Sequence, residues 1–409
     1  MVELRVPRED EFVDFMRPVW RGFGDPEPTD AHVDDTRLLW ELDRSIGALD
    51  GTEWVGAAGA FTFDVTLPGG TTAPVAGVTM VGVAATHRRQ GILRTLMARQ
   101  LDDIVDRGEP LAALTASETG IYGRFGYGWA AEMAGVEIET TRSAFRTAPS
   151  APGRVRSVRL AEAAGPMAAA YERSRLGRAG TLTRADQYWE LVQRDRDWWR
   201  HGASALFVVV HDDADGEPDG YATYRVRFRW ESGLPNSTVV VEDLVGTDAE
   251  VEATLWRFLC DIDLAAKVEG TCRPVDDPVR WRLVEPRRLR TTEVSDYLWV
   301  RVLDVPTALA ARRYGRVDGL VVEVVDEFRP ASGGRFRLDG GPDGAECTRT
   351  DSSPDLVLGA EELGSIFLGG VAPGAMAAAR RIEECTPGAV ARADALFMTT
   401  PAPFNGTMF

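Results

Sequence analysis

The stretch THRRQGILRTLMARQL, Thr86–Leu101, sets the side chains of His87, Arg88 and Arg89 just before a glycine and an apolar helical pattern. The first backbone N–H groups of a helix lack intrahelical partners, and the helix dipole places partial positive charge there. Arginines at this end oppose the dipole unless an anion is bound. The pattern therefore predicts a phosphate site, with a plain loop leading into a surface helix as the alternative.

The flanking residues predict an alternation of strands and helices. Residues 46–87 read as three strands separated by turns at Asp50-Gly51 and at Pro68-Gly69-Gly70. The last of them, over residues 75–84, is small and apolar, as a strand buried on both faces would be. Residues 9–24 have helical spacing, and residues 109–118 read as the strand that follows the quoted helix. These elements indicate an α/β (α+β) fold with mixed central sheets flanked by helices.

Composition excludes several classes of protein. The 409 residues carry 46 basic and 63 acidic side chains, a net charge of −17, which argues against a nucleic-acid partner. An acidic surface suits cationic substrates, or it serves solubility alone. The first residues lack the apolar core of a secretory signal, and no apolar run is long enough to span a bilayer. We therefore expect a cytoplasmic protein without a membrane partner, although secretion is not excluded.

Cysteine and histidine are sparse and scattered. No two of the four cysteines form a C-x-x-C pair, and the four histidines lack metal-ligand spacing. We expect free buried thiols and no metal. The cysteines are Cys260, Cys272, Cys347 and Cys385, and the histidines are His32, His87, His201 and His211.

Two further segments follow the first. Residues 146–157 are rich in Pro, Ser and Ala, which places a domain boundary near residue 150. Beyond it, helices are expected at 163–175 and 184–195, strands at 205–212, 220–232 and 238–246, and a helix over 248–266. The order of these elements repeats that of the first domain only coarsely. A third unit begins near residue 295, with strands at 319–328, 334–341 and 345–350 and helices at 360–370 and 374–384.

Two motifs carry a family resemblance. The sequence Arg88-Arg89-Gln90-Gly91-Ile92-Leu93 resembles the pyrophosphate loop of GNAT acyl-CoA N-acyltransferases, with Leu93 in place of the usual small residue. The string SETGIYGRFGYG, residues 117–128, together with a C-terminal Phe, resembles the Eis (enhanced intracellular survival) family. The resemblance implies tandem GNAT folds and a sterol-carrier-protein-like α+β domain. The implied segments are a catalytic acetyl-CoA-binding domain at 1–150, a second GNAT-like domain without a cofactor loop at 151–294, and a C-terminal domain at 295–409 whose end reaches the active site.

The same resemblance implies a function and its residues. It implies N-acetylation of aminoglycosides, polyamine-like molecules or lysine side chains by acetyl-CoA, and a homohexamer. Tyr122 would protonate the departing CoA thiolate, and the α-carboxylate of Phe409 would be the general base. The residues implied to bind the cofactor are Val81, Gly82 and Val83 along the pantetheine arm, Arg89, Gln90, Gly91, Ile92, Leu93 and Arg94 around the pyrophosphate, and Ser117 and Glu118 at the cleft wall.

Structural interpretations of these residues stay open at this point. Tyr122 could be a core aromatic residue of a glycine-rich turn, and Phe409 could pack for stability alone. Asp25 is a further candidate for the amine pocket. Two other functions are also open, a hydrophobic-ligand or lipid-binding protein and a CoA-binding pseudoenzyme scaffold. An apolar tunnel through residues 295–400 would favour the lipid-binding protein.

Overall fold

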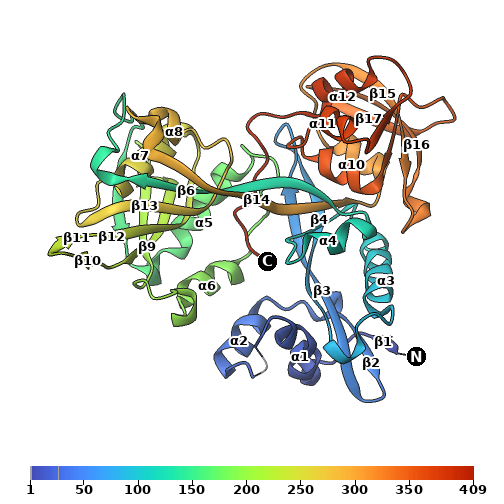
Figure 1. Ribbon diagram of the computed structural model, residues 1–409, viewed down its shortest axis with the longest axis horizontal. Coiled ribbons are helices and arrows are strands. Elements are labelled where there is room, and N and C mark those ends of the chain that lie inside the picture. The colour runs from blue at the N-terminus through green and yellow to red at the C-terminus, as the bar shows by residue number, and fades with distance from the viewer. Residues whose placement is uncertain (1, 26) are drawn as a thin grey trace. The chain divides into compact units, whose positions relative to one another are not determined.

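A computed structural model describes residues 2–25 and 27–409. It divides into two compact units (Figure 1). Unit 1 contains the chain up to Ala131, Tyr297–Thr400 and Met408–Phe409, and unit 2 contains Glu132–Asp296 and Pro401–Thr407. The last nine residues of the chain are therefore shared between the units.

The first part of unit 1 is a mixed sheet with helices on both faces (Figure 1). The strand order is β1-β2-β3-β4-β5, and β5 also pairs antiparallel with Trp299–Val302 at the end of β14. Only β4 and β5 run parallel among the first five strands. The elements are β1 (Glu3–Arg5), α1 (Phe12–Gly22), α2 (Asp30–Leu39), β2 (Ile46–Asp50), β3 (Glu53–Thr66), β4 (Thr72–Val83), α3 (Ile92–Asp106), β5 (Leu111–Leu114), α4 (Thr119–Tyr122), β6 (Gly128–Glu139) and β14 (Leu289–Val302).

The side chains of β3 point alternately to the two faces of this sheet. Trp54 packs with Phe12 and Phe15 of α1, whereas the next residue, Val55, packs with Ile92 and Leu96 of α3. Successive side chains of a strand point to opposite faces, so one apolar strand serves both helices. The three strands and the helix expected from residues 46–106 are confirmed.

The second part of unit 1 is a five-stranded sheet of order β17-β16-β15-β18-β19. Its interior is filled by its own side chains, including the fully buried Leu320, Phe336 and Phe367. Its elements are α9 (Val305–Ala311), β15 (Asp318–Val325), β16 (Gly334–Gly341), β17 (Gly344–Arg349), β18 (Leu356–Gly359), α10 (Ala360–Phe367), α11 (Pro373–Ala378), β19 (Ile382–Glu384) and α12 (Ala389–Phe397).

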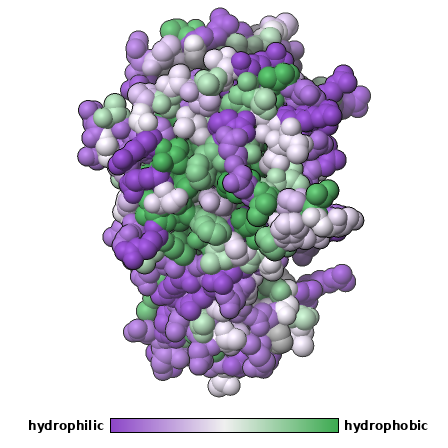
Figure 2. Space-filling view, turned by 90° about the vertical axis from the view of Figure 1, so that its left-hand side faces the viewer, coloured by the Kyte–Doolittle hydropathy of each residue, from purple (hydrophilic) through white to green (hydrophobic). Residues whose placement is uncertain are grey.

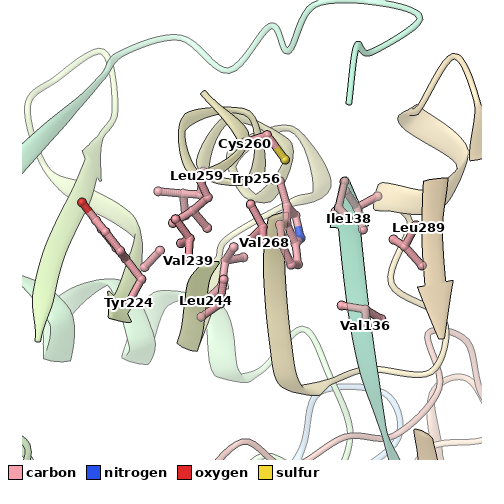
Figure 3. Close-up of a cluster of buried hydrophobic side chains, with 14 of the residues drawn as sticks. Val136, Ile138, Tyr224, Val239, Leu244, Trp256, Leu259, Cys260, Val268 and Leu289 are labelled. Carbon is pink, nitrogen blue, oxygen red and sulfur yellow. The ribbon is translucent and has the colours of Figure 1, made fainter. Parts of the chain in front are cut away.

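Unit 2 is a second mixed sheet, in which the strands follow the order β6-β13-β12-β9-β8-β7. Strands β12 and β13 are parallel, as β4 and β5 are in unit 1. Figure 3 shows Trp256 and Leu259 of α7 lying over Val239, Val268 and other apolar side chains of the sheet. The elements are β7 (Arg154–Val158), α5 (Ala164–Arg175), α6 (Asp186–Arg194), β8 (Phe207–Asp212), β9 (Pro218–Arg227), β10 (Trp230–Glu231), β11 (Leu234–Pro235), β12 (Ser237–Gly246), α7 (Ala249–Cys260), β13 (Ala265–Arg273) and α8 (Val279–Arg282).

Three expectations from the sequence were wrong. The helix expected over 248–266 ends at Cys260, and Ala265 already belongs to β13. The helix expected over 374–384 ends at Ala378 and is followed by β19. Cys385 is an exposed thiol, whereas Cys260 and Cys347 are buried.

Large apolar side chains remain exposed on unit 2. Phe228, Trp230 and Leu234 around the β10–β11 hairpin each expose more than half of their surface. Figure 2 shows hydrophobic residues exposed among hydrophilic ones on the face in view. Exposed apolar surface of this kind is typical of a contact with another molecule.

Candidate active site

Strands β4 and β5 part in the middle of the first sheet. Their parallel pairing runs from Val75–Leu111 to Gly77–Ala113, and β4 continues to Val83 without β5 beside it. The backbone groups of the outer half of β4 therefore lack β5 as a hydrogen-bonding partner. An extended ligand can pair with such a strand edge as another strand would.

A bulge in β4 marks the point of divergence. The register with β3 shifts between Ala57–Gly82 and Gly59–Thr79, and Met80 in this interval has a positive φ of 54°. A bulge of this kind re-aims the strand beside a functional site. Val81 lies in the bulge, and Gly82 and Val83 follow it; these three residues, which were predicted to hold the pantetheine arm, are partly exposed.

The cationic loop precedes α3 and is open to solvent. Arg89 and Gly91 both adopt the left-handed conformation, with φ of 62° and 83°, and α3 starts at Ile92. No side chain caps this helix, and its first turn contains no acidic residue. The free N–H groups and the arginines before them suit a pyrophosphate. Arg94 has a second neighbour, since its guanidinium lies 5.0 Å from the centre of the Phe328 ring.

The glycine-rich string forms a tight turn that packs beside the end of β4 and the start of α3. Tyr122 ends the short helix α4 and is 8% exposed, in one apolar cluster with Val81 and Leu93. Burial raises the pKa of the Tyr122 phenol, and the nearby Glu118 charge adds to the rise. The phenol therefore keeps its proton at neutral pH. Ser117 and Glu118 are exposed at the start of the turn.

A buried ion pair supports the far side of the same turn. Gly126 has a φ of 82°, and a Cβ there would lie 2.7 Å from the guanidinium of Arg301. Arg301 is fully buried and pairs with Asp326. The string needs glycine at this position both for its backbone conformation and for the space that Arg301 fills.

The last residue of the chain lies where β4 and β5 part. The Thr115 hydroxyl, directly after β5, donates to a terminal oxygen of Phe409 at 3.4 Å. The Phe409 ring packs edge-on against Phe63 with 5.3 Å between centroids. A Cβ on Gly77, in the last β4–β5 pair, would come within 3.1 Å of that ring.

Two contacts of this site have no signal in the sequence. Thr115 and Phe63 contact Phe409, but neither belongs to a recognisable motif. The carboxylate of the candidate Asp25 lies 3.2 Å from Nδ1 of His32, and its place in an amine pocket stays a prediction.

The described part of the chain was compared with the requirements of a metal-ligating cluster and of a membrane-spanning helix. Within residues 2–25 and 27–409, no group of three or more His, Cys, Asp or Glu side chains is arranged to hold a metal ion. In the same ranges, none of the helices combines the length and the apolar character needed to cross a bilayer.

The chain matches three family descriptions. Residues 3–130 and residues 180–302 each match an acetyltransferase (GNAT) domain. Residues 305–406 match a sterol carrier protein domain. Tandem GNAT folds and a sterol-carrier-like domain were the expected fold, and this expectation is confirmed.

Relatives and a solved structure match over most or all of the chain. An uncharacterised N-acetyltransferase of Streptomyces avermitilis is 43% identical over 98% of each chain. The N-acetyltransferase Eis of Mycobacterium tuberculosis is 37% identical over 86% of this chain and 85% of its own. The crystal structure of Eis1 from Mycobacterium abscessus superposes with a TM-score of 0.88, at 34% identity over all of both chains. The chain is therefore an N-acetyltransferase that belongs to the Eis family of GNAT enzymes.

Proposed function

We propose that the chain transfers the acetyl group of acetyl-CoA to a primary amine of a cationic small molecule, an aminoglycoside or a polyamine-like compound, or to an exposed lysine. The observation that carries the proposal is the position of Phe409. Its terminal carboxylate lies beside Thr115, where the free edge of β4 begins. A carboxylate at this place can hold a cationic amine and accept its proton.

Different residues beside β4 and α3 would bind different parts of acetyl-CoA. Arg89, Gln90, Gly91, Ile92 and the N–H groups of Leu93 and Arg94 would hold the pyrophosphate. The free edge of β4 at Val81, Gly82 and Val83 would pair with the pantetheine arm, and its N–H groups would stabilise the oxyanion. Ser117 and Glu118 would line the wall of the cleft.

Two groups of the chain would then move the protons. The amine nitrogen bonds to the thioester carbon, and the C–S bond breaks. The Phe409 carboxylate accepts, directly or through water, the proton that the neutral amine nitrogen loses once it has bonded to the carbon. Tyr122 donates its phenolic proton to the departing thiolate, and its raised pKa keeps that proton available at neutral pH.

The alternative of a lipid-binding protein finds less support. The third part of the chain fills its interior with its own side chains, as Phe336, Phe367 and Phe397 are each at most 1% exposed. Even Arg312 is buried there, donating to the carbonyl oxygens of Phe367 and Phe397. Boundaries at residues 150 and 295, a cytoplasmic location and a homohexamer stay predictions.

The proposed function can be tested by thiol release from acetyl-CoA with a multi-amine aminoglycoside. Wild type is compared with Tyr122→Phe and with a chain extended by one glycine after Phe409. We expect both variants to bind CoA normally and to lose about 10²–10⁴-fold in kcat, the usual contribution of a positioned acid or base.

Three outcomes would contradict parts of the proposal. An unchanged kcat in the extended chain would remove the terminal carboxylate from the reaction, and an unchanged kcat in Tyr122→Phe would remove the acid. CoA binding without turnover of any amine in a broad panel would show a pseudoenzyme scaffold.

A further inference from the structure

Unit 2 contains a counterpart of the cofactor cleft. Strand β12 runs parallel to β13, as β4 does to β5. A helix follows each of the first strands: α7 comes directly after β12, whereas α3 comes after β4 and the cationic loop. The register of β12 with β9 also shifts, between Val241 and Asp243. The second GNAT fold thus retains the strand geometry of a cofactor site.

The helix that follows this strand excludes a phosphate. Asp248 caps α7 by accepting hydrogen bonds from the N–H groups of Glu250 and Val251, at 2.8 and 3.0 Å. Glu250 and Glu252 add two acidic residues to the first turn. The N–H groups that would bind a pyrophosphate are thus already used by a carboxylate of the chain.

A cavity of about 380 Å³ lies at this place, and residues of the C-terminal tail form part of its wall. Its lining combines the end of β12 and the start of α7 with Phe404 and Gly406 of the tail. Asn405 and Thr407, the neighbours of Gly406, are almost completely buried, at 0% and 1% exposed. A chain end with this degree of burial differs from a frayed terminus.

Arg184 is the centre of the tail contacts. Its Nε donates to the Thr407 hydroxyl at 2.9 Å, and its Nη2 donates to the Gly406 carbonyl at 3.0 Å. Its Nη1 donates at 2.7 Å both to Asp243 and to the Tyr221 hydroxyl. One buried guanidinium therefore joins the tail to β9 and β12, with its charge compensated by Asp243.

Further bonds hold the residues before Thr407. The Asn405 side chain accepts from the Thr407 N–H at 3.1 Å and donates to the Thr407 carbonyl at 2.7 Å. Asp276 accepts from the Ala402 N–H, and Arg178 donates to the Ala402 carbonyl, both at 2.8 Å. The backbone of Ala402–Thr407 is thus bound at both of its ends within unit 2.

We propose that the second GNAT fold uses its lost cofactor cleft as an anchor for the C-terminal tail, with Arg184 and Thr407 as positioning residues for the carboxylate of Phe409. Only Met408 separates the anchored Thr407 from Phe409. Because a single residue links Thr407 to Phe409, the carboxylate can reach few positions. The anchoring of Thr407 therefore restricts where the base can lie. This inference rests on the proposed function of Phe409.

The test compares Thr407→Val with Thr407→Ser. Valine keeps the size and β-branching of threonine but cannot bond to Arg184, whereas serine keeps the hydroxyl. Two quantities are measured on the full-length chain, the rate at which a carboxypeptidase releases Phe409, followed by intact mass, and kcat for thiol release. We expect Thr407→Val to lose Phe409 at least five-fold faster and to have a kcat at least ten-fold lower, at unchanged acetyl-CoA KM.

Two further variants test whether the bond between Thr407 and Arg184 is responsible. Thr407→Ser should behave as wild type in both assays, and Arg184→Lys should resemble Thr407→Val, because a lysine cannot make the forked contacts of the guanidinium. Equal thermal unfolding of the two Thr407 variants would show that the fold is intact.

Each discordant outcome overturns the proposal. Wild-type release of Phe409 in Thr407→Val would mean that the bond between Arg184 and the Thr407 hydroxyl does not hold the tail. Faster release without a loss of kcat would mean that the anchored tail does not serve catalysis. Failure of the proposed function is seen separately, because a glycine added to the wild type would then leave kcat unchanged while the release rates still report the anchor.

Discussion

The Thr115 hydroxyl donates to a terminal oxygen of Phe409, although 294 positions of sequence separate the two residues. Thr115 directly follows β5, at the point where β4 and β5 stop pairing. The end of the chain thus meets the central opening of the first sheet. Whether the hydroxyl helps to hold the carboxylate there can be measured directly.

Replacing Thr115 by valine should slow the reaction without unfolding the protein. The change removes one hydrogen bond to the carboxylate, worth roughly 0.5–1.5 kcal/mol, which corresponds to a loss of about 2- to 12-fold in kcat. Steady-state thiol release measures it, and Thr115→Ser is the control that keeps the hydroxyl. A valine variant with wild-type kcat would show that the 3.4 Å contact does not position the carboxylate.

Gly91→Ala and Gly108→Ala form a matched pair on the two ends of α3. Both glycines have a positive φ, 83° and 78°, and in both cases an added Cβ meets no atom within 4 Å. The strain of a left-handed alanine, about 1–2 kcal/mol, should therefore lower stability equally. Only Gly91→Ala should raise the KM for acetyl-CoA, since only Gly91 precedes the free N–H groups of the helix. An equal KM for both variants would place the pyrophosphate elsewhere.

Asp326→Asn should be strongly destabilising. It leaves the guanidinium of Arg301 fully buried without its counter-charge, at a cost of about 3–5 kcal/mol. Asp339→Asn is the control, because Asp339 pairs with Arg337 at the surface, where such a pair contributes little to stability. Urea unfolding measures both. Equal losses of stability in the two variants would show that breaking the buried Arg301–Asp326 pair costs no more than breaking a surface pair.

Glu252→Gln should change how stability depends on pH. Burial raises the pKa of the Glu252 carboxyl from 4.5 to about 7. Between these values the folded state keeps a proton that the unfolded state releases, so rising pH weakens the wild type, by up to about 3 kcal/mol. Relative to the wild type, the glutamine variant should therefore gain stability from pH 5 to pH 8. Thermal unfolding at both pH values checks this, and a constant difference between the two proteins would contradict it.

The sequence predicted an element correctly where that element depends only on neighbouring residues. The quoted stretch Thr86–Leu101 does form a loop and a helix, with Gly91 in the left-handed conformation that precedes α3. The expected helix over 248–266 failed for the opposite reason. Apolar residues continue past Cys260, but Leu264 has a φ of 64°, and the residues that follow pair with both β12 and β6. Pairing with distant strands outweighs helix propensity there.

By itself, the sequence determined the order of the elements, the cationic loop before α3 and the glycine-rich turn that carries Tyr122, because each of these depends on neighbouring residues. The tertiary structure alone decided that Thr115 and Phe63 contact Phe409, and that Arg184 binds the tail at Thr407. No local pattern specifies these pairs, since they form only when distant strands pair and bring their ends together. The free energy that holds them is that of the folded sheets, and single-sequence patterns do not contain it.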